Sequence, residues 1–142
     1  MGGTLDIAIK KNPKSEWSEG DGDHHTDLAI EPLEWEKLFF DTLSAPKWET
    51  YLEGEDIVEY YERQRKLFLA AVSKKGYPML SRIWRIYQDT IYYPHEVGQL
   101  LSECSELRKT TRSPEAARAL EKLISGCHAA TENASGILLL SD

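Results

Sequence analysis

Apolar residues alternate with polar ones at both ends of the chain and recur at helical spacing between the ends. Leu5, Ile7 and Ile9 alternate with small or charged residues across 4–10, which predicts a half-buried strand. Residues 137–140 are apolar throughout, which is typical of a fully buried strand. Because an isolated strand leaves its backbone hydrogen-bonding groups without partners, we expect these two terminal strands to pair.

Between the two strands, the spacing of apolar residues predicts five or six helices. The clearest start is at Ser113, Pro114 and Glu115, which place a capping hydroxyl, a proline and an acid where a helix begins. The expected helices begin near residues 31, 47, 55, 78, 94 and 114. The predicted fold class is therefore α+β and predominantly helical, with the helices packed on a small sheet in a single globular domain over residues 1–142.

Residues 12–30 lack any clear periodicity. Trp17 is the one large aromatic residue in this stretch, and glycines and acids are frequent. A connection of this length inside a compact domain is usually functional or disordered. We therefore predict a long, acidic and mobile loop over residues 12–30.

Charge is distributed unevenly along the chain. Residues 1–62 hold sixteen acidic and five basic residues, a net charge of −11, whereas residues 63–142 carry a net charge of +4. If the acids share one face, their field attracts a basic partner and repels nucleic acid. The sequence pI of about 5.1 also argues against a nucleic-acid-binding protein.

The charge pattern favours a small, acidic, non-catalytic protein-binding module as the leading hypothesis. An acidic surface raises the rate of association with a basic protein surface, while a few aromatic anchors provide affinity. In size and charge the chain resembles small acidic bacterial proteins that neutralise basic toxins, such as nuclease immunity proteins, although it shares no motif with them. The hypothesis is an inhibitor or immunity-type role, with the candidate contact residues Trp17, Asp21, Asp23, Asp27 and Trp35.

The same loop contains a dense group of potential metal ligands. Carboxylates suit hard cations, and imidazoles suit zinc, nickel or copper. The calcium-loop spacing fails, because counting from Asp21 puts Thr26 at the glycine position and Pro32 at the glutamate position. The alternative hypothesis is a divalent-metal-binding protein or metal-dependent enzyme that uses Asp21, Asp23, His24, His25 and Asp27.

Other features of the sequence limit the remaining function classes. No nucleotide-binding loop, nucleophile elbow, zincin helix or paired-cysteine motif is present, which lowers the expectation of an enzyme and of any cofactor other than a metal. Cys104 and Cys127 fall on apolar helix faces and are expected to be buried thiols. With no signal-peptide pattern and no long apolar run, we expect a cytoplasmic protein without membrane contact. A helical protein that dimerises through its aromatic residues is a third hypothesis.

Overall fold

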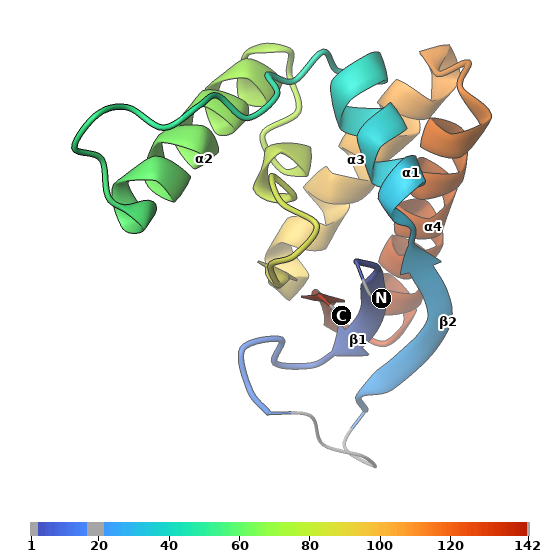
Figure 1. Cartoon of the computed structure of the whole chain (residues 1–142). Coiled ribbons are helices and arrows are strands. Elements are labelled where there is room, and N and C mark those ends of the chain that lie inside the picture. Colours follow the sequence, from blue (N-terminus) through green and yellow to red (C-terminus); the bar gives the residue numbers. More distant parts are fainter. Residues whose placement is uncertain (1–2, 17–21, 142) are drawn as a thin grey trace.

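The computed structural model describes residues 3–16 and 22–141 and contains an antiparallel sheet with helices on one face (Figure 1). About half of the described residues are helical, so the predicted α+β class is confirmed. The described residues contain four α-helices, fewer than the five or six predicted. In chain order the elements are β1 (Leu5–Lys10), β2 (His24–Ile30), α1 (Pro32–Glu36), the π-helix η1 (Lys37–Thr42), α2 (Ile57–Lys74), the 3-10 turn η2 (Leu80–Arg82), β3 (Thr90–Tyr92), α3 (Pro94–Thr110), α4 (Pro114–Glu132) and β4 (Gly136–Ser141).

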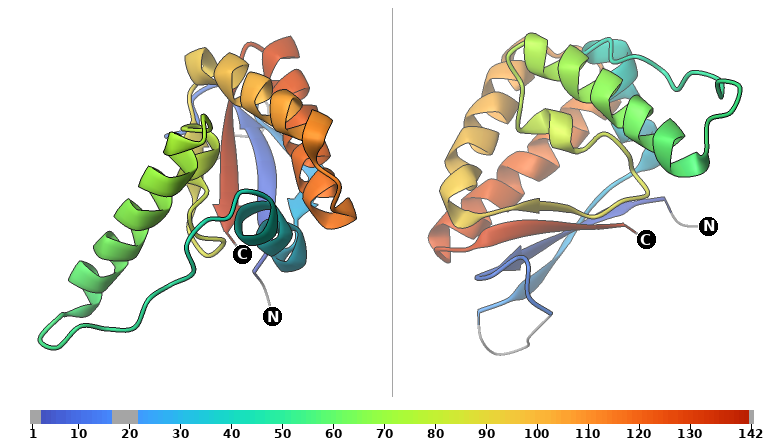
Figure 2. Two further views of the ribbon diagram at one scale, coloured as in Figure 1. Left: turned by 90° about the horizontal axis from the view of Figure 1, so that it is seen from above. Right: turned by 90° about the vertical axis from the view of Figure 1, so that its left-hand side faces the viewer.

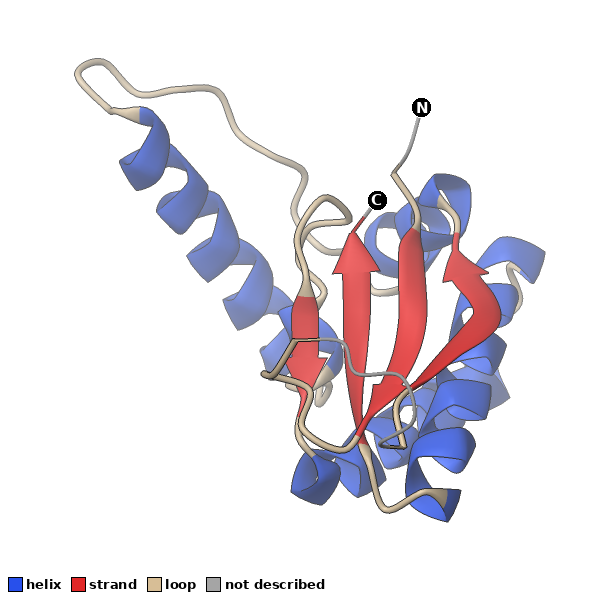
Figure 3. Cartoon of the chain, turned by 90° about the horizontal axis from the view of Figure 1, so that it is seen from below, coloured by secondary structure: helices blue, strands red, loops and turns tan. Residues whose placement is uncertain are grey.

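The four strands lie in the order β2-β1-β4-β3, and neighbouring strands are antiparallel (Figure 3). β1 pairs with β4 along its whole length, from Leu5 opposite Ser141 to Lys10 opposite Gly136. The predicted pairing of the two terminal strands is therefore confirmed. It places both ends of the chain in the two central strands of the sheet.

One face of the sheet forms the floor of the hydrophobic core. Leu5, Ile7 and Ile9 of β1 are fully buried and, since side chains alternate across a strand, share this face. Gly126 lets α4 lie close to β1, because an added Cβ would come within 3.0 Å of Ile7 Cγ2. The capped start predicted for α4 is confirmed, since the Ser113 side chain accepts a hydrogen bond from the Ala116 backbone N–H.

Part of the predicted 12–30 loop is wrong, because residues 24–30 form the edge strand β2. Ile30 pairs with Leu5, and the Thr26 hydroxyl donates a hydrogen bond to the Ile7 carbonyl at 2.7 Å. The sequence hides this strand because it lies at an edge of the sheet, where His24 and neighbouring polar side chains stay in solvent. Its polar residues therefore break the alternation that a strand with one buried face normally shows.

Two predicted helices are absent. Residues 47–52 have no helical structure and instead run along α2. Residues 78–91 contain only the turn η2, followed by irregular chain and the start of β3. The buried Glu103 carboxylate of α3 accepts hydrogen bonds from the Met79 and Leu80 backbone N–H groups, which fixes this short turn. The apolar residues at 78–91 recur at helical spacing, but they belong to an irregular segment that packs over the core.

The two oppositely charged halves of the chain meet at Glu34 in α1. The Glu34 carboxylate is buried and lies 2.8 Å from the Lys122 ammonium and 3.2 Å from the Arg118 guanidinium, both of α4. Burial alone would raise the pKa of Glu34, but the Glu31 backbone N–H and Lys122 outweigh it and lower that pKa. Part of the charge asymmetry in the sequence is therefore neutralised inside the fold.

Helix α2 stands apart from the other helices (Figure 2). Its C-terminal half joins the core through Phe68 and Val72, which are fully buried. Phe68 stacks on Trp35 of α1, with ring centroids 6.1 Å apart. The N-terminal half of α2 extends beyond the sheet and the other helices, and the segment 44–56 runs back along it. We call residues 44–75 the aromatic arm.

Candidate protein-binding surface

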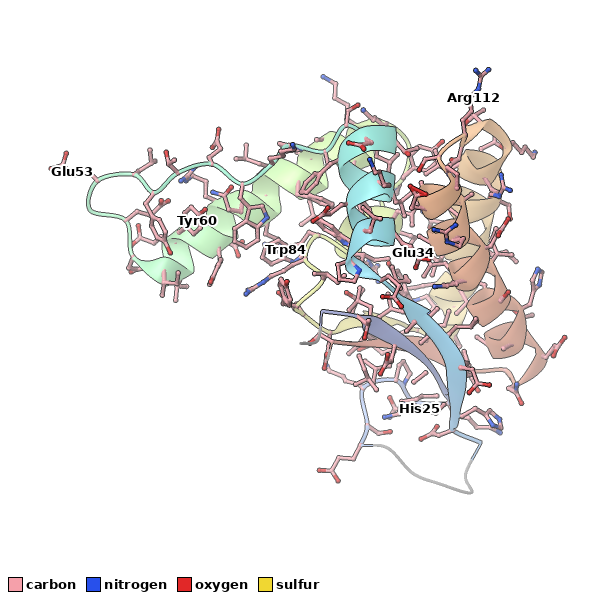
Figure 4. All side chains as sticks on the ribbon, turned by 45° about the vertical axis from the view of Figure 1, so that its right-hand side comes forward. His25, Glu34, Glu53, Tyr60, Trp84 and Arg112 are labelled. Atoms are coloured by element: carbon pink, nitrogen blue, oxygen red, sulfur yellow. The ribbon has the colours of Figure 1, made fainter. Side chains whose placement is uncertain are left out.

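The predicted acidic site is only partly within the described residues. Trp17 and Asp21 lie outside them. Asp23 precedes β2 and accepts a hydrogen bond from the Lys11 backbone N–H at 3.2 Å. His25 and Asp27 are exposed on β2, and Figure 4 shows His25 on the part of the strand far from the arm.

No assembled metal site is found among the described residues. In residues 3–16 and 22–141, no group of three or more histidine, cysteine or acidic side chains is arranged to hold an ion. His24 and His25 are consecutive in a strand, so their side chains point to opposite faces of the sheet. The alternative hypothesis of a metal centre at 19–27 stays a prediction, because Asp21 is not described.

Trp35, a predicted contact residue, belongs to the hydrophobic core. Its ring is buried, and its indole N–H donates a hydrogen bond to the Ile83 carbonyl at 2.8 Å. It packs against Phe39, Phe40 and Phe68, with ring centroids 5.1–6.1 Å apart. Trp35 therefore links the arm to the core and does not form an exposed anchor.

Aromatic stacking holds the extended segment 44–56 against helix α2 in the arm. Tyr51 stacks on Tyr60 of α2 with ring centroids 3.9 Å apart, and Trp48 meets Tyr61 edge to face at 5.4 Å. At the base of the arm, Trp48 also stacks on Trp84 at 5.8 Å. Such pairs stabilise beyond the area that they bury. An otherwise irregular segment is therefore fixed along one side of a projecting helix.

Polar contacts from Arg63 reinforce the arm. The guanidinium donates to the Glu55 carboxylate at 2.8 Å, to the Glu49 carboxylate at 2.7 Å and to the Thr50 carbonyl at 2.9 Å. The hydrogen bond from Arg63 lowers the pKa of Glu55. In addition, the Tyr60 hydroxyl donates to the Glu49 carbonyl at 2.6 Å. One arginine thus joins three residues of the extended segment to α2.

The end of the arm exposes a cluster of large apolar side chains. The exposed fractions are 53% for Tyr51, 58% for Leu52, 47% for Ile57 and 72% for Val58. They flank the turn that leads into α2 at the outer end of the arm, and Val58 also lines a hollow that it shares with Arg85. We call these four residues the apolar tip. Apolar clusters on protruding features of a protein commonly mark interaction sites.

Acidic residues surround the apolar tip. Glu53 and Asp56 lie in the turn, and Glu59 is one turn into α2; Figure 4 shows Glu53 at the far end of the arm. Asp56 caps α2 by accepting the Glu59 backbone N–H at 2.9 Å, which lowers the pKa of Asp56. The side-chain hydrogen bond with Asp56, followed by the negative charge of Asp56, raises the pKa of Glu59. At neutral pH the tip is therefore an apolar patch in a negative field.

A cleft opens at the base of the arm, where the arm meets α1, η1 and residues 84–87. Its volume is about 330 Å³, near the lower limit for small-molecule sites. The π-helix η1 contributes Phe40 to the wall, and π-helical turns occur often at functional sites. The lining is mostly aromatic: Pro32, Trp35, Glu36, Phe40, Trp48, Trp84, Arg85, Ile86 and Tyr87.

The cysteines do not form a reactive site. Cys104 and Cys127 are buried and unbridged, as predicted. Burial raises the pKa of the Cys127 thiol to about 12 and that of Cys104 well above its usual range. A thiol is nucleophilic as the thiolate, so neither group is activated at neutral pH. His128 follows Cys127 in sequence but is exposed, and His95 is exposed and stacks on Tyr93.

Comparisons with protein-family models, with curated proteins and with solved structures found no match. Among the described residues, no helix has the length and apolar character needed to cross a membrane. Any functional conclusion must therefore come from the surface of the molecule itself. The charge pattern drew attention to the acidic N-terminal half of the chain, but it did not identify the apolar tip.

Proposed function

We propose that the protein is a small, non-catalytic protein-binding module that engages a basic partner through the apolar tip and the acids around it. The observation that carries the proposal is the exposure of four large apolar side chains at the end of a rigid, projecting arm. Single exposed apolar residues are ordinary, whereas such a cluster on a projection is not. A partner that covers the tip removes these side chains from water.

The charge around the tip supports a basic partner. Glu53, Asp56 and Glu59 border the apolar tip, and residues 1–62 carry a net charge of −11. Acids at the rim of an interface steer a positively charged surface and raise the association rate, while buried apolar anchors control dissociation. An inhibitor or immunity-type role is consistent with this arrangement, since such a protein must capture a basic target quickly.

The arrangement of the arm also supports binding without catalysis. The Arg63 contacts and the stacked rings hold the tip in one conformation, so little ordering is needed when a partner binds. Hot-spot residues in interfaces are frequently aromatic, and Tyr51 offers such an anchor next to Leu52. The acidic face of β2, with Asp23 and Asp27, is a second candidate surface that the same experiment tests.

The test is affinity capture at low salt from the native host, with variants compared side by side. Leu52→Ser combined with Val58→Ser removes the most exposed apolar contacts, and Asp23→Asn combined with Asp27→Asn tests the face of β2. Leu33→Ser is the matched control, because Leu33 is exposed to a similar extent on α1. The expected result is a basic protein retained by wild type and by the control but lost by the tip variant.

A second measurement on the captured partner tests the electrostatic part of the proposal. Glu53→Gln combined with Glu59→Gln is expected to slow association and to reduce its salt dependence, with a smaller effect on dissociation. A partner retained equally by the tip variant, or an association rate that does not respond to salt, would contradict the proposal. If only the Asp23→Asn and Asp27→Asn variant loses the partner, the binding surface lies at residues 23–27 and not at the apolar tip.

A further inference from the structure

Arg85 in the aromatic cleft differs from most other arginines of the chain. Its guanidinium lies over the Tyr61 ring at 4.5 Å and over the Trp48 ring at 5.6 Å, and the side chain is half-buried. Within the described part of the chain it donates no hydrogen bond and pairs with no carboxylate. The arginines that do form ion pairs are Arg63, Arg65, Arg82, Arg108 and Arg118.

The lack of a carboxylate partner is notable because the chain has 24 acidic residues. Glu62 lines a neighbouring hollow together with Arg85, but it is bonded to Arg65. An arginine stacked on an aromatic face keeps its N–H groups at the edge of the plane, where they can bind a carboxylate with two parallel hydrogen bonds. Arg85 therefore places at the cleft a guanidinium that has no carboxylate partner among the described residues.

The walls of the cleft favour a flat ring. Trp84 and Trp48 form one stacked wall, with an angle of 15° between their planes, while Phe40 and Tyr87 contribute further aromatic surface. Rings of a ligand gain from offset or edge-to-face contact with such walls. The volume of about 330 Å³ suits a small molecule of one or two fused rings.

The charges beside the cleft disfavour a cationic ligand. Aromatic walls can bind cations, but here the cations of the chain already lie over the rings: Arg85 over Trp48, and the Lys47 ammonium over Phe40 at 5.9 Å. A further cation would be repelled by both. Glu36, the acidic residue of the lining, is exposed, where water and salt screen its charge.

We propose that this cleft binds a small molecule in which a planar aromatic ring carries an anionic group, with Arg85 as the residue that selects for the charge. Trp48, Trp84 and Phe40 would hold the ring, and the edge of the Arg85 guanidinium would hold the anion. None of the four apolar-tip residues lines this cleft, so the proposal does not depend on the proposed protein partner, although Val58 lines the adjoining hollow that Arg85 also borders. Figure 4 shows Trp84 where the arm joins the rest of the molecule, away from Glu53 at the tip.

The test uses three probes that share one ring system and differ in charge: naphthalene carboxylate, naphthalene carboxamide and naphthylmethylammonium. Each is titrated into the full chain and followed by nitrogen–proton correlation spectra, in which the indole N–H signals of Trp48 and Trp84 report on the cleft. The carboxylate is expected to bind about tenfold more tightly than the carboxamide. The ammonium is expected to bind more weakly than both.

Arg85→Gln is expected to remove the preference for the carboxylate while leaving the affinity for the carboxamide unchanged, which also shows that the cleft is intact. Arg112→Gln is the matched control, because Arg112 is exposed and lies far from Trp84 (Figure 4). It should keep the preference. Equal affinities for carboxylate and carboxamide, tightest binding of the ammonium, no change at Trp48 and Trp84, or a preference that survives Arg85→Gln would each overturn the proposal.

Discussion

The body of the molecule and the aromatic arm use apolar residues in opposite ways. In the body, the sheet and helices α3 and α4 bury most of their large apolar residues, as Leu120 and Ile137 illustrate, and none of those described is exposed. In the arm, aromatic residues bury one another along the length of α2, while Leu52 and Val58 at the end stay in water. Burial in the body stabilises the fold, whereas the exposed residues of the arm add little to stability and are the basis of the proposed binding role.

The largest expected effect comes from a cavity in the body. Leu120 of α4 is fully buried in the core, so Leu120→Ala is expected to lower the free energy of unfolding by about 3 kcal/mol. Chemical denaturation checks this value. A loss below about 1 kcal/mol would show that α4 is not packed as tightly as the body requires.

A smaller effect is expected from the ion cluster that joins α1 to α4. Lys122→Ala leaves the buried Glu34 carboxylate with the Arg118 guanidinium and the Glu31 backbone N–H, and is expected to cost about 2 kcal/mol at neutral pH. The pKa of Glu34 is lowered in the folded protein, so this stability is present above its ordinary value of 4.5 and is lost as the pH falls through the folded pKa. The difference between wild type and variant should therefore narrow below about pH 4.5. A difference that stays constant with pH would contradict this account.

In the arm, removal of the arginine contacts should act locally. Arg63→Gln removes the arginine contacts that hold residues 49–55 to α2, and the backbone amides of this segment are expected to exchange with solvent roughly tenfold faster. The thermal midpoint should shift by less than about 2 °C, because the body does not depend on these contacts. Hydrogen exchange resolved by residue measures both regions at once. Faster exchange throughout α3 and α4 would show that the two regions are not independent.

The smallest effect on stability is expected at the apolar tip. Val58 is the most exposed of the four tip residues, so Val58→Ser should change the free energy of unfolding by no more than about 0.5 kcal/mol. The same substitution is expected to weaken binding of the captured partner strongly. Calorimetry of the two proteins against that partner checks the contrast. If the variant unfolds more easily but binds its partner normally, Val58 contributes to stability and not to binding, which would contradict the proposal.

Local signals predicted much of the body correctly. The alternation at Leu5–Ile9 and the apolar run at 137–140 were sufficient to predict two strands and their pairing, because both faces of the central strands lie in a defined environment. The capping sequence at Ser113 placed the start of α4 correctly. The expected degree of burial was wrong for both strands, because β1 also buries Ala8 and Lys10 whereas Leu138 and Leu140 of β4 are only half-buried.

Other parts depend on contacts between distant residues and could not be read from local pattern. β2 forms because its backbone pairs with the free edge of β1. Residues 78–91 stay irregular because the Glu103 carboxylate accepts hydrogen bonds from the backbone N–H groups of the turn η2. In α2 the buried stripe runs through Tyr60, Gln64, Phe68 and Val72. Ile57 and Val58 lie off this stripe, and their exposure depends on which face of the helix meets the core, which a local pattern does not show.

Hydrogen exchange of the full chain, with and without the captured basic partner, tests most directly whether the apolar tip is the binding surface. If the apolar tip is the binding surface, the amides of residues 50–59 should become protected in the complex, while the exposed strand β2 exchanges as before. Protection confined to residues 22–30, with the tip unchanged, would contradict the account and assign binding to the acidic face of β2.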